Sequence, residues 1–533
     1  MTDYQDHQST EGLAILDCGS QYTLLIAKTL REQGIYSEVF PHHQATPVSS
    51  RFKGIILSGG PQSAGAPGAP IFPAWLQEDL RPILGICYGM QLLVLQHGGS
   101  LRQSQQREYG SATVQWSDSS VETLPEHIQQ FCQGLWGTSQ QVWMSHGDDA
   151  GALGNDLQVL ARTDAAVIAA LAHKSLPRFG IQFHPEVQHT VDGYLLLQNF
   201  ARKVCGLRTV WTAKEMLAFA EKSLVDTLGS AAERAKLRVL VAVSGGVDST
   251  VLASFLGQHF TPEQLCCVLV DHGFLREREA ELVTQSLREQ GIQLQVLQAQ
   301  ESFLQCVQGL TDSEAKRKAV GRQFIQCFEE FAQKEGPFTH LAQGTLYPDV
   351  IESAHGGAGA TVIKSHHNVG GLPETLGLKL LEPFRFMFKD EVRSIGRGLG
   401  LSAALVDRHP FPGPGLSIRI PGAVDLEKLT ILRKADAIYM QELRDAGLYA
   451  GIWQAGCVLL SVKSVGVMGD HRTYEWTLVL RAVSSVDGMT AHAIPLPYDF
   501  LALVSTKIIN QVPGINRVLY DVTSKPPATI EWE

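Results

Sequence analysis

The sequence has no surplus of positive charge: its 533 residues hold 44 lysines and arginines against 54 aspartates and glutamates, a formal net charge of −10. Because phosphate-backbone contacts need clustered Lys and Arg, this balance argues against nucleic acid as a partner. It still permits small anionic substrates, which need only a local basic site. Long apolar runs are missing as well, since no stretch approaches the roughly 18 apolar residues of a membrane span.

Signals for secretion and for cross-linking are also missing. The N-terminus, Met1–Asp6, has neither the basic start nor the apolar run of a signal peptide, so we expect a cytoplasmic protein that does not bind membranes. Nine scattered cysteines, an odd number in a long chain, do not form the pattern of a disulfide framework. No two of them have CxxC spacing, so the sequence predicts no zinc site.

The chain is too long for one hydrophobic core at the usual domain size of about 100–200 residues, so two to four domains are expected. Short apolar runs alternate with helical patterns in its first third, which is typical of a mainly parallel sheet. Strands are predicted at Leu13–Leu16, Gly54–Leu57 and Pro82–Ile86, and helices at Tyr22–Gln33 and Met90–His97.

The same alternation resumes with strand Leu237–Val243 and helix Ser249–His259. The dense Pro and Gly of His409–Gly415 then interrupt both helix and sheet, which marks a boundary before a smaller domain. The predicted fold class is therefore α/β, with two doubly wound, mainly parallel-sheet domains followed by a smaller α+β domain. We place these domains at residues 11–207, 208–408 and 409–533.

The segment Gly85-Ile-Cys87-Tyr-Gly89 lies between a predicted strand and a predicted helix. Glycines on both sides permit the sharp turn of a nucleophile elbow, here with sulfur in place of the serine oxygen. The N-terminus of the following helix favours a thiolate. A buried structural cysteine is the alternative interpretation of Cys87 taken alone.

A base for this thiol is predicted in the segment Gly180-Ile-Gln-Phe-His184-Pro-Glu186. On an extended segment, residues two apart point to the same side, so Glu186 can orient the imidazole of His184. Backbone N–H groups at Gly59 and Tyr88 are candidates for an oxyanion hole. A packed histidine is the alternative for His184 alone, but the two motifs together favour a Cys-His-Glu triad.

A second candidate site is the loop Ser244-Gly245-Gly246-Val247-Asp248-Ser249, between a predicted strand and a predicted helix. It has no lysine after it and is therefore not GxxxxGK[ST]. Its consecutive N–H groups and the helix dipole favour an anion, while Asp248 can hold Mg²⁺. An ordinary Ser-Gly-Gly turn is the alternative for the loop taken alone.

These motifs resemble known families. Gly85–Gln91 and Phe183–Glu186 resemble class I glutamine amidotransferases, and Ser244–Ser249 resembles the loop of the N-type ATP pyrophosphatases. Nearly the whole chain resembles the family of glutamine-hydrolysing GMP synthases, through further motifs at Val270–Arg276, Leu341–Ser353, Lys364–Gly371, Phe388–Arg393, His409–Gly415 and Ser524–Glu533.

The resemblance implies an ATP-dependent ligase that hydrolyses L-glutamine at Cys87, adenylates XMP with release of pyrophosphate, and lets ammonia displace AMP to give GMP. It implies Mg²⁺ as a cofactor and a homodimer formed through the C-terminal domain. The implied glutamine-binding residues are Gln91, Ser145, His146 and Asp148. The implied ATP-binding residues are Ser244–Ser249, Val270 and Lys389, and the implied XMP-binding residues are Arg322, Lys525, Thr529 and Glu531.

Two other classes of function stay open from the residues alone. One is a different ATP-dependent amidating or thiolating enzyme, for which a tRNA partner would need a basic patch that the net charge does not favour. The other is a binding or regulatory protein with degenerate sites, against which the intact Cys87, His184, Glu186 and Asp248 argue.

Overall fold

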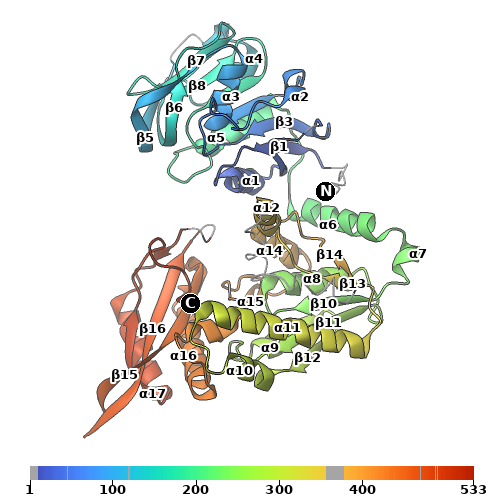
Figure 1. Cartoon of the computed structure of the whole chain (residues 1–533), viewed down its shortest axis with the longest axis vertical. Helices are drawn as coiled ribbons and strands as arrows, with labels where there is room; N and C mark the ends of the chain where they lie inside the picture. Colours follow the sequence, from blue (N-terminus) through green and yellow to red (C-terminus); the bar gives the residue numbers. More distant parts are fainter. Residues whose placement is uncertain are drawn as a thin grey trace. The chain divides into compact units, whose positions relative to one another are not determined.

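The computed structural model describes residues 10–44, 46–117, 121–355, 377–468, 470–485, 488 and 490–533. The chain divides into two compact units, Met1–Lys222 and Ser223–Glu533, which are described separately below (Figure 1). Within the described ranges, no helix is both long and apolar enough to cross a membrane. The motif Lys364–Gly371 lies outside the described residues. The three domain ranges expected from the sequence stay predictions.

The first unit is built on a nine-stranded sheet in the order β2-β1-β3-β4-β9-β8-β7-β5-β6. Five neighbouring strands are parallel, namely β2 (Ser37–Pro41), β1 (Gly12–Asp17), β3 (Phe52–Leu57), β4 (Ile83–Ile86) and β9 (Arg178–Ile181). The remaining strands pair antiparallel, namely β8 (Ile168–His173), β7 (Leu157–Thr163), β5 (Leu101–Trp116) and β6 (Ser139–Ala150). The antiparallel strands were not predicted.

Strands β1 and β4 of this unit are short, mainly apolar runs because helices and loops cover both faces of the sheet there. Every residue of β1 and β4 is buried, as expected for strands packed on both faces. The helices are α1 (Thr23–Glu32), α2 (Ala74–Gln77), α3 (Tyr88–Gln96), α4 (Glu126–Phe131) and α5 (Gly193–Gln198), the last continuing as a π-helix over Asn199–Val204. Because β3, β4 and β9 are adjacent and parallel, their C-terminal ends lie side by side at one edge of the sheet.

The second unit begins with a five-stranded parallel sheet in the order β12-β11-β10-β13-β14. Its strands are β10 (Val239–Val243), β11 (Leu265–Asp271), β12 (Leu294–Gln298), β13 (His340–Ala342) and β14 (Lys379–Leu381). The helices of this part include α8 (Val247–Gly257), α9 (Glu279–Glu289), α10 (Gln300–Val307), α11 (Ser313–Glu335), α12 (Tyr347–His355), α14 (Lys389–Gly398) and α15 (Ala403–Val406). Helix α6 (Ala213–Leu228) and the short α7 (Ala231–Arg234) precede them.

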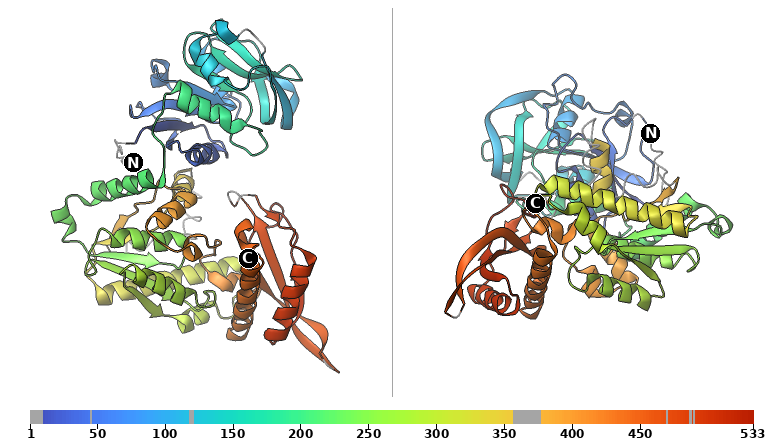
Figure 2. Two further views of the ribbon diagram at one scale, coloured as in Figure 1. Left: turned by 180° about the vertical axis from the view of Figure 1, so that it is seen from behind. Right: turned by 60° about the horizontal axis from the view of Figure 1, so that its bottom comes forward.

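The C-terminal part of this unit pairs a small sheet with two helices. Its elements are α16 (Leu426–Asp445), β15 (Gln454–Met468), β16 (His471–Ser484), β17 (His492–Ala493), α17 (Tyr498–Gln511) and β18 (Ile515–Tyr520). Strand β16 pairs antiparallel with β15 and β17 and parallel with β18. The β15–β16 hairpin extends past α17 in the view of Figure 1, and the back view in Figure 2 shows the same projection.

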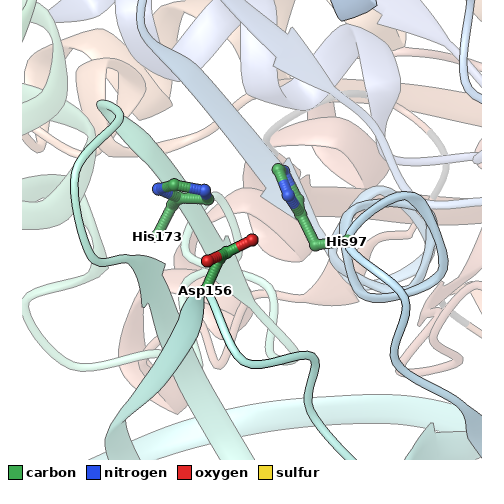
Figure 3. A group of neighbouring side chains, drawn as sticks. All are labelled: His97, Asp156 and His173. Atoms are coloured by element: carbon green, nitrogen blue, oxygen red, sulfur yellow. The ribbon is translucent and has the colours of Figure 1, made fainter.

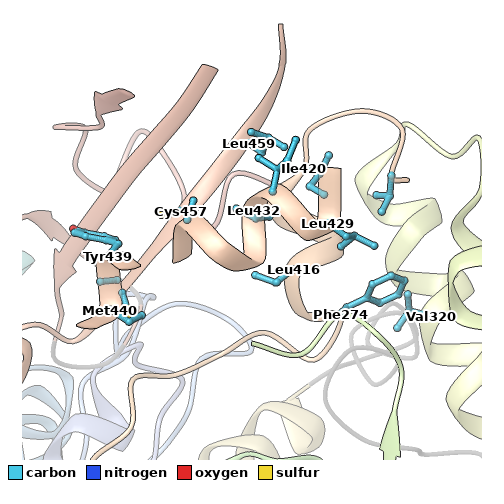
Figure 4. Packing of buried hydrophobic residues seen from close by; sticks show 14 of the residues in the cluster. Phe274, Val320, Leu416, Ile420, Leu429, Leu432, Tyr439, Met440, Cys457 and Leu459 are labelled. Carbon is cyan, nitrogen blue, oxygen red and sulfur yellow. The ribbon is translucent and has the colours of Figure 1, made fainter. Parts of the chain in front are cut away.

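An apolar cluster joins this part to the parallel-sheet part of the same unit. Figure 4 shows Phe274 and Val320 from the latter beside Leu416, Leu432 and Cys457 from the former. The Leu416 N–H donates to the Phe274 carbonyl at 2.8 Å. The neighbouring glycine, residue 415, has a φ of 62°, and a Cβ there would lie 2.3 Å from that carbonyl oxygen, so the Pro- and Gly-rich turn is a packed junction. The predicted α/β fold class is confirmed.

Candidate active sites

Cys87 lies at the sharp turn between β4 and α3, with a positive φ of 52° and a ψ of −103°. The turn requires both flanking glycines. A Cβ on Gly85 would lie 2.4 Å from the carbonyl of Gly89, and a Cβ on Gly89 would lie 2.3 Å from the carbonyl oxygen of Leu57. A non-glycine residue with this backbone costs on the order of 1–3 kcal/mol, so the surrounding structure holds Cys87 in a strained position. Such strain is typical of a nucleophile elbow.

The imidazole of His184 connects Cys87 to Glu186. His184 Nδ1 lies 2.7 Å from Glu186 Oε1, and both side chains are buried. The ring also hydrogen-bonds the Cys87 side chain. Burial by itself lowers the pKa of His184, but the Glu186 charge and the hydrogen bonds to both partners outweigh burial and hold that pKa well above its usual value. The arrangement therefore suits a thiolate paired with an imidazolium.

The two candidate oxyanion donors lie beside these side chains. Tyr88 is the first residue of α3, and a Cβ added to Gly59 would lie 3.3 Å from His184 Cε1. Within the described ranges, neither backbone N–H has a hydrogen-bond partner. Two unpaired donors next to a nucleophile are what a developing oxyanion requires.

Strand β6 carries three of the four candidate glutamine-binding residues, Ser145, His146 and Asp148, and α3 carries the fourth, Gln91. The Cys87 thiol donates to the Ser145 carbonyl at 3.7 Å, and Gln91 Nε2 donates to the Asp148 carbonyl at 3.0 Å. His146 Nδ1 lies 3.1 Å from the same Asp148 oxygen. The four predicted residues are thus brought to the neighbourhood of the elbow, where α3 meets β6.

Gln182 is a neighbour of Cys87 that the motifs did not single out. Its Nε2 lies 3.6 Å from Cys87 Sγ. The signal that could have identified it is alternation, because Gln182, His184 and Glu186 occupy every second position. Although the segment bends after β9, the side chains of Gln182 and His184 both contact Cys87, and that of Glu186 contacts His184.

The glycine loop of the second unit turns directly from β10 into α8. Gly245 has a φ of 81°, and the hydroxyls of Ser244 and Ser249 lie 3.1 Å apart. Val247 opens the helix, while Gly246 N–H donates to Ser244 Oγ at 3.3 Å. The loop is therefore closed on itself around a helix N-terminus, the geometry that receives a phosphate.

Asp248 combines one paired and one unpaired oxygen. Its Oδ2 accepts from Lys389 Nζ at 3.4 Å. Its Oδ1 is buried and, among the described residues, has no hydrogen-bond partner. Mg²⁺ prefers carboxylate oxygens, so this residue fits the implied metal ion.

Two further residues border the loop. Val270 is the next-to-last residue of β11, the strand adjacent to β10, and it is buried. Arg408, which the motifs also did not single out, donates from Nη1 to the Gly245 carbonyl at 2.9 Å and pairs with Glu279. The loop is thus fixed from its outer side by an arginine from a segment far along the chain.

The four candidate XMP-binding residues come from two segments of the second unit, helix α11 and the C-terminal segment after β18. Arg322 is exposed on α11, and its Nε donates to the Lys318 carbonyl at 3.3 Å. Lys525 Nζ donates to the carbonyl of residue 488 at 2.7 Å, and the Thr529 hydroxyl donates to the Glu531 carbonyl. In the described part of the chain, no hydrogen bond or ion pair joins Arg322 to the other three.

Glu531 is held inside the C-terminal part. Both of its carboxylate oxygens accept from Arg419, at 2.8 and 3.0 Å. Burial by itself raises the pKa of Glu531, but the charge and hydrogen bonds of Arg419 outweigh burial and lower that pKa. Arg419 therefore holds the Glu531 carboxylate in its charged form.

A separate group of possible metal ligands lies in the first unit. The ligand atoms of His97, Asp156 and His173 lie within 4.8 Å of one another (Figure 3). His173 Nδ1 already accepts two backbone N–H groups of the following loop, at 3.1 and 2.9 Å, which places the ring proton on Nε2. The guanidinium of Arg178 lies 3.4 Å from His97 Nε2. Because both histidines already accept hydrogen bonds and a cation lies beside them, we assign no metal to this group.

Three family models match the chain. They are the class-I glutamine amidotransferase over residues 14–204, the PP-loop domain over residues 216–327 and the GMP synthase C terminal domain over residues 441–532. The glutamine-hydrolysing GMP synthase of Bartonella bacilliformis is 48% identical over 99% of this chain and 100% of its own length. That of Zymomonas mobilis is 49% identical over 98% of each chain, and that of Thermosynechococcus vestitus is 48% identical over 98% of this chain and 96% of its own. The chain belongs to the family of glutamine-hydrolysing GMP synthases.

Proposed function

We propose that this chain converts XMP to GMP, using ammonia from L-glutamine and the energy of ATP. The observation that carries the proposal is that one chain holds both a strained Cys87 turn paired with His184 and Glu186 and a phosphate-binding loop with an unpaired Asp248 oxygen. Full-length similarity to glutamine-hydrolysing GMP synthases supports it. Ammonia made in the first unit is used in the second.

In the first unit, the Cys87 thiolate attacks the side-chain amide carbon of glutamine. The N–H groups of Gly59 and Tyr88 stabilise the oxyanion, and His184, oriented by Glu186, donates a proton to the departing ammonia. A water deprotonated by His184 then releases glutamate from the thioester. Gln91 and β6, through Ser145, His146 and Asp148, would position the substrate, which their contacts near the sulfur support.

In the second unit, the O2 atom of XMP attacks the α-phosphate of ATP, and pyrophosphate leaves. The loop Ser244–Ser249 would bind that pyrophosphate through its N–H groups and hydroxyls, with Val270 against the nucleotide and Lys389 beside the phosphates. Mg²⁺, when held by Asp248, would neutralise the charge that develops on the leaving group. Ammonia then attacks the activated purine carbon and AMP leaves.

The XMP and dimer assignments extend the same proposal. Lys525 and Arg322 offer cations for the 5′-phosphate, and Thr529 and Glu531 lie on the same C-terminal segment as Lys525. A homodimer through the C-terminal part is supported by the projecting hairpin. There, Val465, Val467 and Tyr474 are 51%, 72% and 60% exposed, and Val465 pairs with Tyr474 across the hairpin. An exposed apolar face of this kind favours a second copy.

Paired assays with glutamine and with ammonium salt test the division of labour. Cys87→Ala should abolish glutamine-driven GMP formation and keep ammonia-driven formation, whereas Asp248→Ala should lose both. Cys306→Ala on α10, a cysteine outside both sites, is the matched control and should keep both. Equal loss of both activities in folded Cys87→Ala, or the absence of XMP-dependent AMP release in the wild type, would overturn the proposal.

A further inference from the structure

Gln182 reaches Cys87 because of the register of the parallel sheet. Ile181, the last residue of β9, is opposite Ile86, the last residue of β4. The residues that follow them, Gln182 and Cys87, are therefore neighbours. The Cys87 N–H donates to the Ile181 carbonyl at 2.7 Å. The backbone thus fixes the neighbourhood, and the Gln182 side chain completes it with Nε2 at 3.6 Å from Cys87 Sγ.

The amide of Gln182 is fully buried, with 0% of the residue exposed. Its Oε1 has no hydrogen-bond partner among the described residues. A buried, unsatisfied amide oxygen destabilises a fold, so packing alone would favour an apolar side chain of the same length. The amide therefore lowers stability where it lies, and the group that it does contact is the Cys87 sulfur.

The Cys87 sulfur has three polar neighbours: the Ser145 carbonyl, Gln182 Nε2 and the His184 ring. The first can contact only the thiol form favourably, whereas the other two favour the thiolate form. As a thiol, Cys87 donates to the Ser145 carbonyl at 3.7 Å. As a thiolate it has no proton for that carbonyl, and it accepts from Gln182 Nε2 and from His184. An N–H donor strengthens its hydrogen bond when the acceptor becomes an anion.

We propose that Gln182 is a positioning residue of the glutaminase centre, whose amide N–H holds the sulfur of Cys87 in its thiolate form facing His184. The inference rests on the proposed role of Cys87 as the nucleophile. Gln182, His184 and Glu186 then act as one alternating series, in which the first and second residues contact the sulfur and the third contacts the ring.

Gln182→Met tests this, since it keeps an unbranched chain of similar volume and removes the donor. In the full-length enzyme, iodoacetamide labelling of Cys87, followed by peptide mass spectrometry, gives the rate of alkylation against pH. The midpoint of that profile should rise by about one pH unit, the order of one charge-assisted hydrogen bond. The kcat of glutamine-driven GMP formation should fall roughly tenfold with little change in KM.

Two readouts separate positioning from packing. Ammonia-driven GMP formation should be unchanged, and the thermal midpoint should be equal or higher because the unsatisfied oxygen is gone. Gln182→Glu, nearly identical in shape, places an acceptor against the sulfur and should raise the alkylation midpoint further. An unchanged alkylation profile in either folded variant would overturn the proposal, whatever the thermal midpoint of that variant.

The design also separates failure of this inference from failure of the proposed function. If Cys87→Ala kept glutamine-driven activity, Cys87 would not be the nucleophile, whatever the labelling profiles show. If Cys87→Ala lost that activity while Gln182→Met kept both its kcat and its alkylation midpoint, the nucleophile would stand and the role of Gln182 would fall.

Discussion

Replacing Glu186 by Gln should cut glutamine-driven GMP formation by about three powers of ten. The change keeps the shape of the side chain and removes one buried charge, whose oxygen lies 2.7 Å from His184 Nδ1. For unit charges about 4 Å apart at an effective dielectric constant of about 20, the interaction is about 4 kcal/mol. Lost from the transition state, that energy corresponds to roughly a thousandfold slower reaction.

The pH dependence of this variant follows from His184. Its pKa is raised in the wild type, so the pair contributes stability that is fully present below the unfolded histidine pKa of about 6.5 and is lost as pH rises through the folded pKa. In Glu186→Gln, burial acts on the ring without the compensating charge, so the pKa of His184 should fall. The thermal midpoint of the wild type should therefore exceed that of the variant most at low pH, and the gap should narrow as the pH is raised.

The assay compares glutamine-driven and ammonia-driven rates in the same preparation. Glu32→Gln is a matched control, because this exposed glutamate on α1 lies 3.7 Å from Lys28 in a surface pair worth at most about 1 kcal/mol. The control should change neither rate. A loss of less than about tenfold in folded Glu186→Gln, or a parallel loss of the ammonia-driven rate, would refute the reasoning.

Three further variants probe other parts of the chain. Gly85→Ala places a Cβ 2.4 Å from the Gly89 carbonyl, so it should lower the thermal midpoint and the glutamine-driven rate, as overpacking costs about 1–3 kcal/mol, while ammonia-driven activity is kept. Arg419→Met leaves the largely buried carboxylate of Glu531 without its arginine and should lower the free energy of unfolding in urea by about 3 kcal/mol. Val465→Glu should shift the protein to monomers in analytical ultracentrifugation, and an unchanged sedimentation coefficient would contradict the proposed interface.

Elements with strong local signals could be predicted from the sequence. Helix α1 (Thr23–Glu32) begins and ends within one residue of the predicted range Tyr22–Gln33, and β4 (Ile83–Ile86) follows the apolar run predicted at Pro82–Ile86. Helix α16 begins after Asp425. The side chain of Asp425 caps the helix, because its Oδ1 accepts from the Lys428 N–H at 2.8 Å. In each case the information lies within a few residues of the element itself.

The antiparallel half of the first sheet had no comparable local signal. Strand β5 (Leu101–Trp116) is rich in Gln, Ser and Arg, and its stability comes from pairing with β6 and β7, which lie later in the chain. Such pairing depends on tertiary context more than on the propensities of the strand.

The candidate sites divide in the same way. Cys87 and Asp248 follow apolar strands and lie within recognisable turns, so they could be singled out. Gln182 and Arg408 act on groups 95 and 163 positions away in the sequence, and only the folded sheet brings them there. Local patterns thus identify the chemistry, and long-range register identifies the residues that support it.

The backbone at Cys87 has a consequence for laboratory evolution. A φ of 52° suits glycine, so Cys87→Gly relieves strain at the elbow. A screen that rewards heat resistance without selecting for glutamine use would enrich that replacement and eliminate the sulfur. Libraries aimed at a hardier catalyst should therefore keep this codon invariant or select for growth on glutamine as the nitrogen donor.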